Sequence, residues 1–255
     1  MARNIILTLS YLGTGFAGWQ KTPFKMSIQE MLEKALQRIL RETPQLQAAS
    51  RTDAGVHAMS QIVNFFTDNP IDLPLLKRAL NGTLPKEISV LFIEEKTDPF
   101  HPTLDCKKKE YRYYICNSSV QLPFHRNTSW HVPYSLDLEK MRTGARILLG
   151  SHDFSAFCND RSSWDRNPVC HLEEISILEL PKDRLCLSVI GDHFLYKMVR
   201  NLVGTLIDIG RGKLYVDDLS LILQKKERKL AGVTAPAHGL CLHHIYYKEN
   251  SHETQ

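Results

Sequence analysis

The sequence predicts an α+β fold with mainly antiparallel strands, and three observations lead to this prediction. Strand-like segments outnumber the helical segments and enclose them. The order of elements in the first hundred residues partly recurs in the remainder, although no convincing sequence repeat accompanies it. The chain has 255 residues, which is enough for one large domain or two modest ones, each with its own core.

The first part of the chain alternates strands and helices. A strand over residues 5–11 ends at a glycine-rich stretch, Gly13–Gly18. Ser27 and Glu30 have the spacing of a capping box, and apolar residues then recur at helical spacing, so an amphipathic helix is expected over 28–42. Further strands are expected over 60–67 and 88–95, with a short helix over 74–80 between them.

Residues 96–105, which contain Pro99 and Pro102, have the composition of a linker. We therefore expect an N-terminal α+β half over 1–102 and a C-terminal α+β half over 103–255. In the second half the patterns predict strands over 110–117, 172–180, 185–190 and 243–247, and helices over 136–149, 194–209 and 217–225.

Composition and charge are those of an ordinary globular protein with a mild basic excess. Hydrophobic residues make up 43% and charged residues 24% of the chain, and the formal net charge is +4. This charge is compatible with a polyanionic partner without demanding one. No apolar run approaches the roughly 20 residues that span a bilayer, and the N-terminus leads directly into a strand. We expect a cytoplasmic protein with no membrane association.

The cysteines do not indicate a disulfide framework or a zinc ribbon. The chain has six cysteines and no CxxC pair. Cys158, Cys170 and His171 are near one another in sequence, but no fourth ligand follows at a spacing typical of zinc sites.

The most informative segment is Arg51-Thr52-Asp53-Ala54-Gly55-Val56-His57. Asp53 lies two residues after a guanidinium, which favours an ionised carboxylate, and two residues before a glycine, which permits backbone angles that a Cβ forbids. Two interpretations stand side by side. The loop can present a nucleophile or general base, or it can be an ordinary turn, in which Asp and Gly are common.

This heptapeptide resembles the signature of the tRNA pseudouridine synthase A family. Other family-like stretches follow in order along almost the whole chain: residues 13–20, 109–113, 150–157 and 194–204. The chain is identified as a member of that family. The resemblance implies a pseudouridine-synthase-like fold in which two α+β halves share one sheet, with the active-site cleft between them. It also implies that the protein isomerises uridine to pseudouridine at positions 38, 39 and 40 of the tRNA anticodon stem-loop.

The implied reaction breaks the N1–C1′ bond of uridine, turns the base and rejoins it through C5. Because it involves no redox step and no external group, we expect neither a cofactor nor a metal. A carboxylate near the sugar–base junction is needed, much as in glycosidases. The resemblance implies that Asp53 is this nucleophile. Attack at C1′, addition to the base and deprotonation of the sugar all stay open.

The resemblance assigns two further residues to the active site. Tyr111 lies in a strand-like segment and would, on its own, be a core residue with its hydroxyl at the surface. The family match places it in the pocket, stacking on the uracil and moving a proton. Arg200 lies in a mostly apolar helix, where it either extends to water or pairs with an acid. The family match favours an ion pair with Asp53.

Basic residues around the expected pocket strand are candidates for RNA contacts: Arg51, Lys107, Lys108, Lys109 and Arg112. A second basic run, residues 225–229, receives no assignment. The chain departs from the family pattern at Thr103 and Cys170, where the family commonly has Arg. These changes remove positive charge but do not affect Asp53, Tyr111 or Arg200.

Two other functions were weighed. A catalytically inactive tRNA-binding protein or RNA chaperone could keep the same scaffold. Such a protein would not need Asp53, Tyr111 and Arg200 together. A metal-dependent hydrolase or nuclease using Asp53 and His57 lacks a third ligand at a recognisable spacing.

The expected partners are tRNA and a second copy of the chain, because the tRNA path in the family crosses two protomers.

Overall fold

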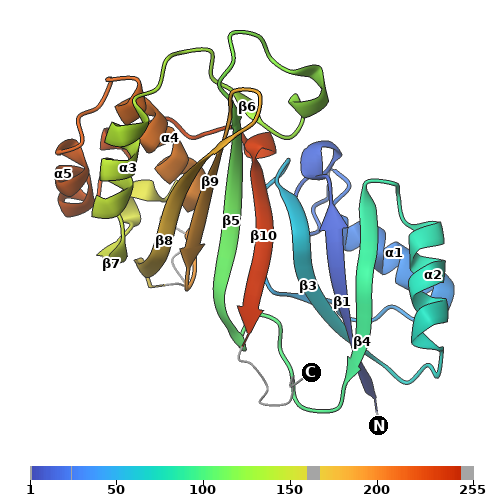
Figure 1. The fold of residues 1–255 in the computed structure, drawn as a ribbon. Helices are drawn as coiled ribbons and strands as arrows, with labels where there is room; N and C mark the ends of the chain where they lie inside the picture. The colour runs from blue at the N-terminus through green and yellow to red at the C-terminus, as the bar shows by residue number, and fades with distance from the viewer. Residues whose placement is uncertain (1, 24, 160–166, 248–255) are drawn as a thin grey trace, which may run out of the picture. The chain divides into compact units, whose positions relative to one another are not determined.

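A computed structural model describes residues 2–23, 25–159 and 167–247 of the chain (Figure 1). By their packing, the residues fall into two compact units. Unit 1 contains the chain up to Lys107 and the returning segment from Cys241, and unit 2 contains Lys108–Leu240. The expected division into α+β halves over 1–102 and 103–255 stays a prediction.

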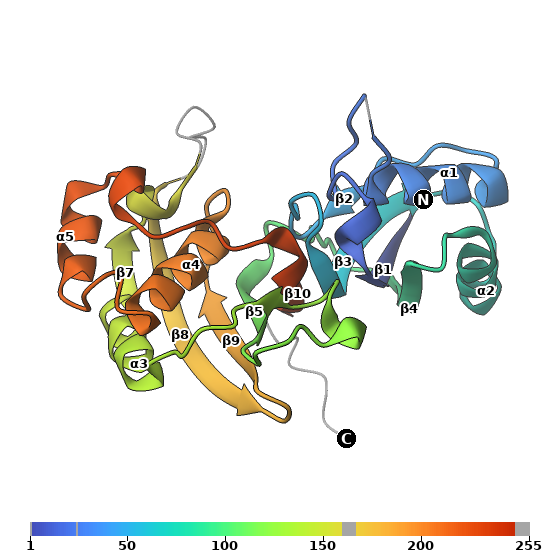
Figure 2. The same cartoon turned by 90° about the horizontal axis from the view of Figure 1, so that it is seen from above.

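Unit 1 is a sheet with helices on one face (Figure 1, Figure 2). Its strand order is β4 (Ile88–Lys96), β1 (Arg3–Tyr11), β3 (His57–Thr67) and β10 (Leu240–Tyr247), and β2 (Gln47–Ala48) pairs with β3. β1 is antiparallel to both neighbours, whereas β10 begins parallel to β3. Helices α1 (Ile28–Leu40) and α2 (Leu73–Thr83) pack against each other, and α2 packs on β4.

The apolar pattern of β1 explains why this face is covered. Ile5, Leu7 and Leu9 recur with the period of two that places side chains on one face of a strand, and all three are fully buried. Helix α1 begins as predicted, since Ser27 Oγ accepts a hydrogen bond from the Glu30 N–H at 3.2 Å. It ends two residues earlier than predicted because Arg41 adopts a left-handed conformation.

The strands of unit 2 pair mainly in antiparallel orientation, with helices on one side (Figure 1, Figure 2). Its strand order is β5 (Cys106–Cys116), β9 (Arg184–Gly191), β8 (Val169–Leu180) and β7 (Gly150–Asp153). The short β6 (Trp130–His131) pairs in parallel with the end of β5. Helices α3 (Leu138–Ile147), α4 (Met198–Gly210) and α5 (Asp218–Lys225) form the helical layer.

Helix α4 is buried on nearly all sides, as its apolar sequence predicts. It begins at Met198, four residues later than the predicted start at 194, because Lys197 has a left-handed backbone with φ of 60°. Residues 194–197 are therefore outside the helix, which leaves the Phe194 ring in edge contact with Tyr111 in β5.

The predicted α+β class with mainly antiparallel strands is confirmed. Several elements differ from the prediction in their bounds, and β2, β6 and β7 were not predicted. β3 begins at His57, three residues earlier than expected, because its first residues pair with β10. β7 was not predicted, since its sequence, Gly-Ser-His-Asp, has low strand propensity and is held by pairing with β8. Among the described residues, no helix has the length and apolar character needed to cross a membrane.

Candidate active site

The segment around Asp53 is a loop between β2 and β3 in unit 1. The Val56 N–H donates to the Asp53 carbonyl oxygen at 3.1 Å and closes a tight turn. Gly55 in this turn has φ of +82°, as the sequence predicted for a residue without a Cβ. Asp53 is half-buried and Arg51 is exposed.

Three hydrogen bonds fix this loop to its surroundings. The Tyr11 hydroxyl and Thr52 Oγ1 are 2.8 Å apart in the core. The Trp19 N–H donates to the Thr52 carbonyl oxygen at 3.0 Å. The Gly13 N–H donates to His57 Nδ1 at 3.0 Å. Thr52, the residue before Asp53, and His57, at the end of the loop, are therefore held by β1 and by the segment Gly13–Trp19 that follows it.

The glycine-rich stretch lies so close to the loop that two of its glycines cannot carry a side chain. A Cβ on Gly13 would lie 2.0 Å from the Val56 carbonyl oxygen. A Cβ on Gly18, whose φ is +95°, would lie 2.5 Å from the Thr52 carbonyl oxygen and 2.9 Å from the Asp53 carbonyl carbon. This packing is the physical reason that the two motifs, more than thirty residues apart, occur together.

Residues 96–105, which have the composition of a linker, also support the loop. The Thr103 hydroxyl donates to the Ala48 carbonyl oxygen at 2.8 Å, in the short strand that precedes the loop. The Tyr247 hydroxyl donates to the Pro102 carbonyl oxygen at 2.9 Å, and the rings of Phe100 and Tyr247 are in edge contact. Thr103, at a position where the family commonly has Arg, has a structural contact in this chain.

Tyr111 and Tyr113 lie on the same face of β5 in unit 2, and both are buried. The Tyr111 ring contacts the edge of Phe194 at a centroid distance of 5.2 Å. The Tyr113 hydroxyl donates to the Pro236 carbonyl oxygen at 2.8 Å, and burial raises the pKa of this phenol. Tyr113 is fully buried, as expected for a core residue.

Arg200 projects from the first turn of α4. Its Nε donates to the Ala235 carbonyl oxygen at 2.7 Å, and the Ala235 N–H donates to the Arg200 carbonyl oxygen at 3.1 Å. These two hydrogen bonds fix the backbone and the Nε atom of Arg200, and with them the direction of the guanidinium relative to the helix.

The predicted RNA-contact residues of β5 differ in exposure. Lys107 is exposed, Lys108 pairs with Glu173 at 2.8 Å and Lys109 is buried. Arg112 pairs with the buried Glu110 at 2.6 Å; burial opposes the charge, but the Glu110 carboxylate raises the pKa of the Arg112 guanidinium. Of these, Lys107 is the side chain most accessible to a phosphate.

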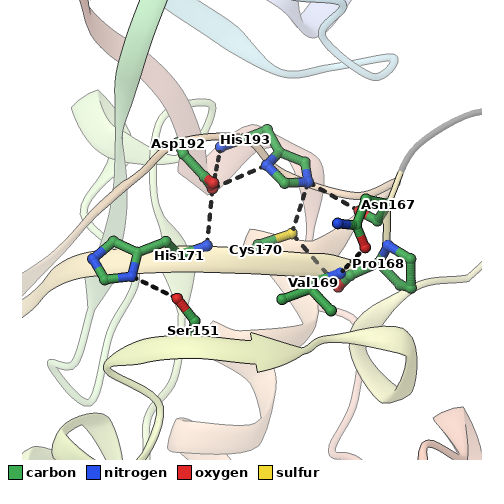
Figure 3. Close-up of polar contacts among 8 residues, drawn as sticks. All are labelled: Ser151, Asn167, Pro168, Val169, Cys170, His171, Asp192 and His193. Carbon is green, nitrogen blue, oxygen red and sulfur yellow. Dashed lines mark hydrogen bonds and ion pairs between the residues drawn. The ribbon is translucent and has the colours of Figure 1, made fainter.

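Cys170, the other departure from the family pattern, belongs to a polar network at the start of β8 (Figure 3). His193 Nδ1 is 3.0 Å from Asp192, and His193 Nε2 is 3.4 Å from Cys170 Sγ and 3.0 Å from the Asn167 carbonyl oxygen. The adjacent His171 instead contacts Ser151. Among the described residues, no group of three or more His, Cys, Asp or Glu side chains could hold a metal ion.

The predicted catalytic and substrate-binding residues thus come from both units. Asp53 and Arg51 belong to unit 1, and Tyr111, Arg112 and Arg200 belong to unit 2. The sequence did not predict the supporting contacts of Tyr11, Thr52 and Gly18, because they join segments that are far apart in the chain.

Comparison with known proteins decides the family. A family model described as tRNA pseudouridine synthase matches residues 8–103 and 145–248. The chain belongs to the tRNA pseudouridine synthase family. It is 50% identical over 247 residues to "tRNA pseudouridine synthase A 2" of Protochlamydia amoebophila (strain UWE25), covering 96% of this chain and 94% of that protein. It is 40% identical over 245 residues to "tRNA pseudouridine synthase A" of Thermoanaerobacter sp. (strain X514), covering 96% and 100%.

Among solved structures, the chain resembles a Cbf5–Nop10–Gar1 complex at a TM-score of 0.39 and 12% identity, over 80% of this chain and 45% of that one. A likeness of this size carries no further conclusion. The family and its named relatives are sufficient to assign the reaction. This pseudouridine synthase is an isomerase that converts uridine to pseudouridine in tRNA. The alternative of an inactive tRNA-binding scaffold is not favoured by these relatives.

Proposed function

We propose that this pseudouridine synthase acts on positions 38, 39 and 40 of the tRNA anticodon stem-loop, with Asp53 as nucleophile. The proposal rests on one observation, which is that contacts on both sides of Asp53 hold its loop in place. The backbone on both sides of Asp53 is fixed by Thr52, His57 and the closely packed Gly18, so the carboxylate is presented at a defined place. Such preorganisation is what a reaction at a sugar–base junction requires.

The two residues of unit 2 would complete this site. Arg200, whose root is fixed by Ala235, would pair with Asp53 and keep it ionised and correctly oriented. Tyr111, held by the edge of Phe194, would stack on the extruded uracil and move the proton that leaves C5.

Substrate binding would use Arg51 and Lys107, which are exposed, together with Lys108, Lys109 and Arg112 around β5. The proposed enzyme works in the cytoplasm as a homodimer and needs neither a metal nor a cofactor. The family's chemistry supports the last point, since the isomerisation exchanges a C–N bond for a C–C bond within one nucleotide.

The test is the variant Asp53→Asn. Asn has the size of Asp and can keep the loop hydrogen bonds, so tRNA binding should survive, but it carries no charge and is a far poorer nucleophile. We expect the rate of tritium release from C5-labelled uridine in tRNA to fall by at least about 10²-fold, the smaller end of what one positioned catalytic group contributes.

The matched control is Asp98→Asn, which removes the same charge from an exposed position in unit 1 and should retain full activity. Release by Asp53→Asn within tenfold of the wild-type rate would show that Asp53 is not the nucleophile. Mapping the labelled positions in the product would test the assignment to 38–40 separately.

A further inference from the structure

The segment 231–235 lies against helix α4 and reaches Arg200. A Cβ on Gly204 would lie only 1.6 Å from the Val233 carbonyl oxygen, so the backbones of the segment and the helix are in direct contact. About one turn toward the start of the helix, the Ala235 carbonyl oxygen accepts the hydrogen bond from Arg200 Nε at 2.7 Å, and the Ala235 N–H donates to the Arg200 carbonyl oxygen at 3.1 Å. The position of this segment therefore sets the direction of the Arg200 guanidinium.

The side chain of Arg228 holds the segment 231–235 in place. Arg228 begins a short 3₁₀ helix, Arg228–Leu230, just before the segment, and it is half-buried. Its guanidinium donates hydrogen bonds to uncharged oxygens of the segment and of its surroundings: the carbonyl oxygens of Ala231 at 3.3 Å and Gly232 at 2.9 Å, Thr234 Oγ1 at 2.8 Å, Asn201 Oδ1 at 2.9 Å and Asn159 Oδ1 at 3.2 Å. Burial lowers the pKa of this guanidinium. One side chain thus connects three residues of the segment to each other and to the rest of unit 2.

Asn201, in the first turn of α4, joins this guanidinium to the helix. Asn201 is fully buried. Its Oδ1 accepts hydrogen bonds from Arg228 Nη2 at 2.9 Å and from Thr234 Oγ1 at 2.6 Å. Its Nδ2 donates to the Phe157 carbonyl oxygen and to Asn159 Oδ1, both at 2.6 Å. A side-chain amide has two donor and two acceptor positions, so the hydrogen-bonding capacity of Asn201 is fully used. Because Arg228 also donates to Thr234, the three side chains form a closed set of hydrogen bonds beside Arg200.

We propose that Arg228 is a positioning residue for Arg200. It holds the segment 231–235 against the first turn of α4, so that Ala235 directs the Arg200 guanidinium. The planar guanidinium of Arg228 is suited to this role because it presents several donors in fixed directions, whereas a lysine presents one ammonium group at a single point. The proposal rests on the proposed function in taking Arg200 as the ion-pair partner of Asp53.

Arg228→Lys tests this role because it keeps the positive charge and loses the set of directed hydrogen bonds. With the charge retained, KM for an unmodified tRNA transcript should stay within a few-fold of wild type. With Arg200 misdirected, kcat should fall by at least about tenfold. Arg146→Lys, the same substitution at an exposed position of α3, should change neither. Rates are measured by tritium release at a temperature where circular dichroism shows each variant folded, since a merely structural role would lower the melting temperature and leave kcat unchanged.

A milder pair of variants decides the question if Arg228→Lys does not fold. Thr234→Val removes the hydroxyl that joins Arg228 to Asn201, and Thr234→Ser keeps it. We expect Thr234→Val to lower kcat several-fold and Thr234→Ser to stay within about twofold of wild type. A wild-type kcat in folded Arg228→Lys, or in Thr234→Val where Arg228→Lys does not fold, overturns the proposal. A raised KM with unchanged kcat also overturns it, because Arg228 would then be an RNA contact.

A double-mutant cycle shows whether Arg228 acts through Arg200. In an Arg200→Lys background the Nε donor to Ala235 is already absent, so adding Arg228→Lys should lower the single-turnover rate by less than about threefold. A further loss of about tenfold or more overturns the proposal, because Arg228 would then act through another group. Failure of the proposed function gives a different result: Arg200→Met is then fully active, whatever the Arg228 variants show.

Discussion

At the scale of single residues, two tyrosines on one face of β5 have different predicted roles. Both Tyr111 and Tyr113 project from β5 and both are buried. The Tyr113 hydroxyl is bound to the Pro236 carbonyl oxygen, and Gly239 approaches its ring so closely that a Cβ there would lie 2.5 Å away. Tyr113 is therefore fixed as a packing residue. Tyr111 is 6% exposed, and its ring has an edge contact to Phe194.

Tyr111→Phe should separate stacking from proton transfer. The Phe ring keeps the contact to Phe194, so KM should stay within a few-fold of wild type, while the loss of the hydroxyl should lower kcat by about 10² or more. Tyr113→Phe is the matched control: it loses the bond to Pro236 and should cost about 1 kcal/mol of stability with kcat preserved. Steady-state kinetics on tRNA transcripts measure both. A Tyr111→Phe enzyme with normal kcat would show that Tyr111 only packs.

The ion pair of Asp153 and Lys226 gives unit 2 a pH-dependent stability. The two side chains are 2.7 Å apart, and the Ser155 N–H also donates to Asp153 at 2.9 Å. Burial acts to raise the pKa of Asp153, but Lys226 and Ser155 outweigh it and lower this pKa below its usual range. A carboxyl whose pKa is lowered by folding stabilises the fold above its unfolded value of about 3.9, and this contribution is lost as the pH falls through the folded value.

We therefore expect Asp153→Asn to lower the free energy of unfolding by about 1 kcal/mol at pH 7, and this difference from wild type to shrink as the pH drops below about 4. Urea unfolding at a series of pH values measures it. Lys226→Gln should show the same loss at neutral pH, because it removes the other half of the pair. A wild-type to variant difference that is constant from neutral to strongly acidic pH would contradict this account.

At the scale of elements, the sequence predicts those helix and strand boundaries that depend on local patterns. It does not predict the boundaries and pairings that depend on contacts between distant segments. The start of α1 was predicted because the Ser27 cap and the apolar spacing are local. The start of α4 was not, because Lys197 adopts a left-handed conformation that apolar periodicity does not encode. The partners of β3 could not be predicted either: its first residues pair with a strand nearly two hundred residues away.

The same distinction applies to the site. The Asp53 heptapeptide, Tyr111 and Arg200 were identified by resemblance to a family, whereas the chemistry of the residues alone left a turn, a core tyrosine and a solvated arginine as alternatives. No local pattern indicated that the Gly13–Gly18 stretch packs on the Asp53 loop, since this contact joins segments from different parts of unit 1.

Gly18→Ala tests whether this packing positions the loop. The added Cβ would meet the Thr52 carbonyl oxygen at 2.5 Å in a backbone with φ of +95°, so the loop must move. We expect a loss of about 1–3 kcal/mol in stability and, in the folded protein, a fall in kcat of at least tenfold. Gly15→Ala is the control from the same stretch, because no atom lies within 4 Å of its added Cβ. Equal kcat in the two variants would mean that the contact does not position Asp53.

At the scale of the whole molecule, the charge of one chain is modest for a protein that binds a polyanion. The formal net charge is +4, from 32 basic and 28 acidic residues. Several cations near the proposed site are also neutralised by partners within the chain: Lys108 by Glu173, and Arg112 by Glu110. A second copy would double the basic surface presented to one tRNA, which is the physical argument for a homodimer.

The homodimer prediction has two readouts that should change together. Light scattering at micromolar concentration should give twice the chain mass of 29.3 kDa. On dilution, the specific activity should fall over the concentration range in which the mass falls to that of one chain, because a monomer would lose the part of the tRNA path contributed by its partner. Asp53→Asn, which should still dimerise, is the control for the mass measurement. A protein that is fully active while its mass is that of a single chain would rule out the dimer as the working form.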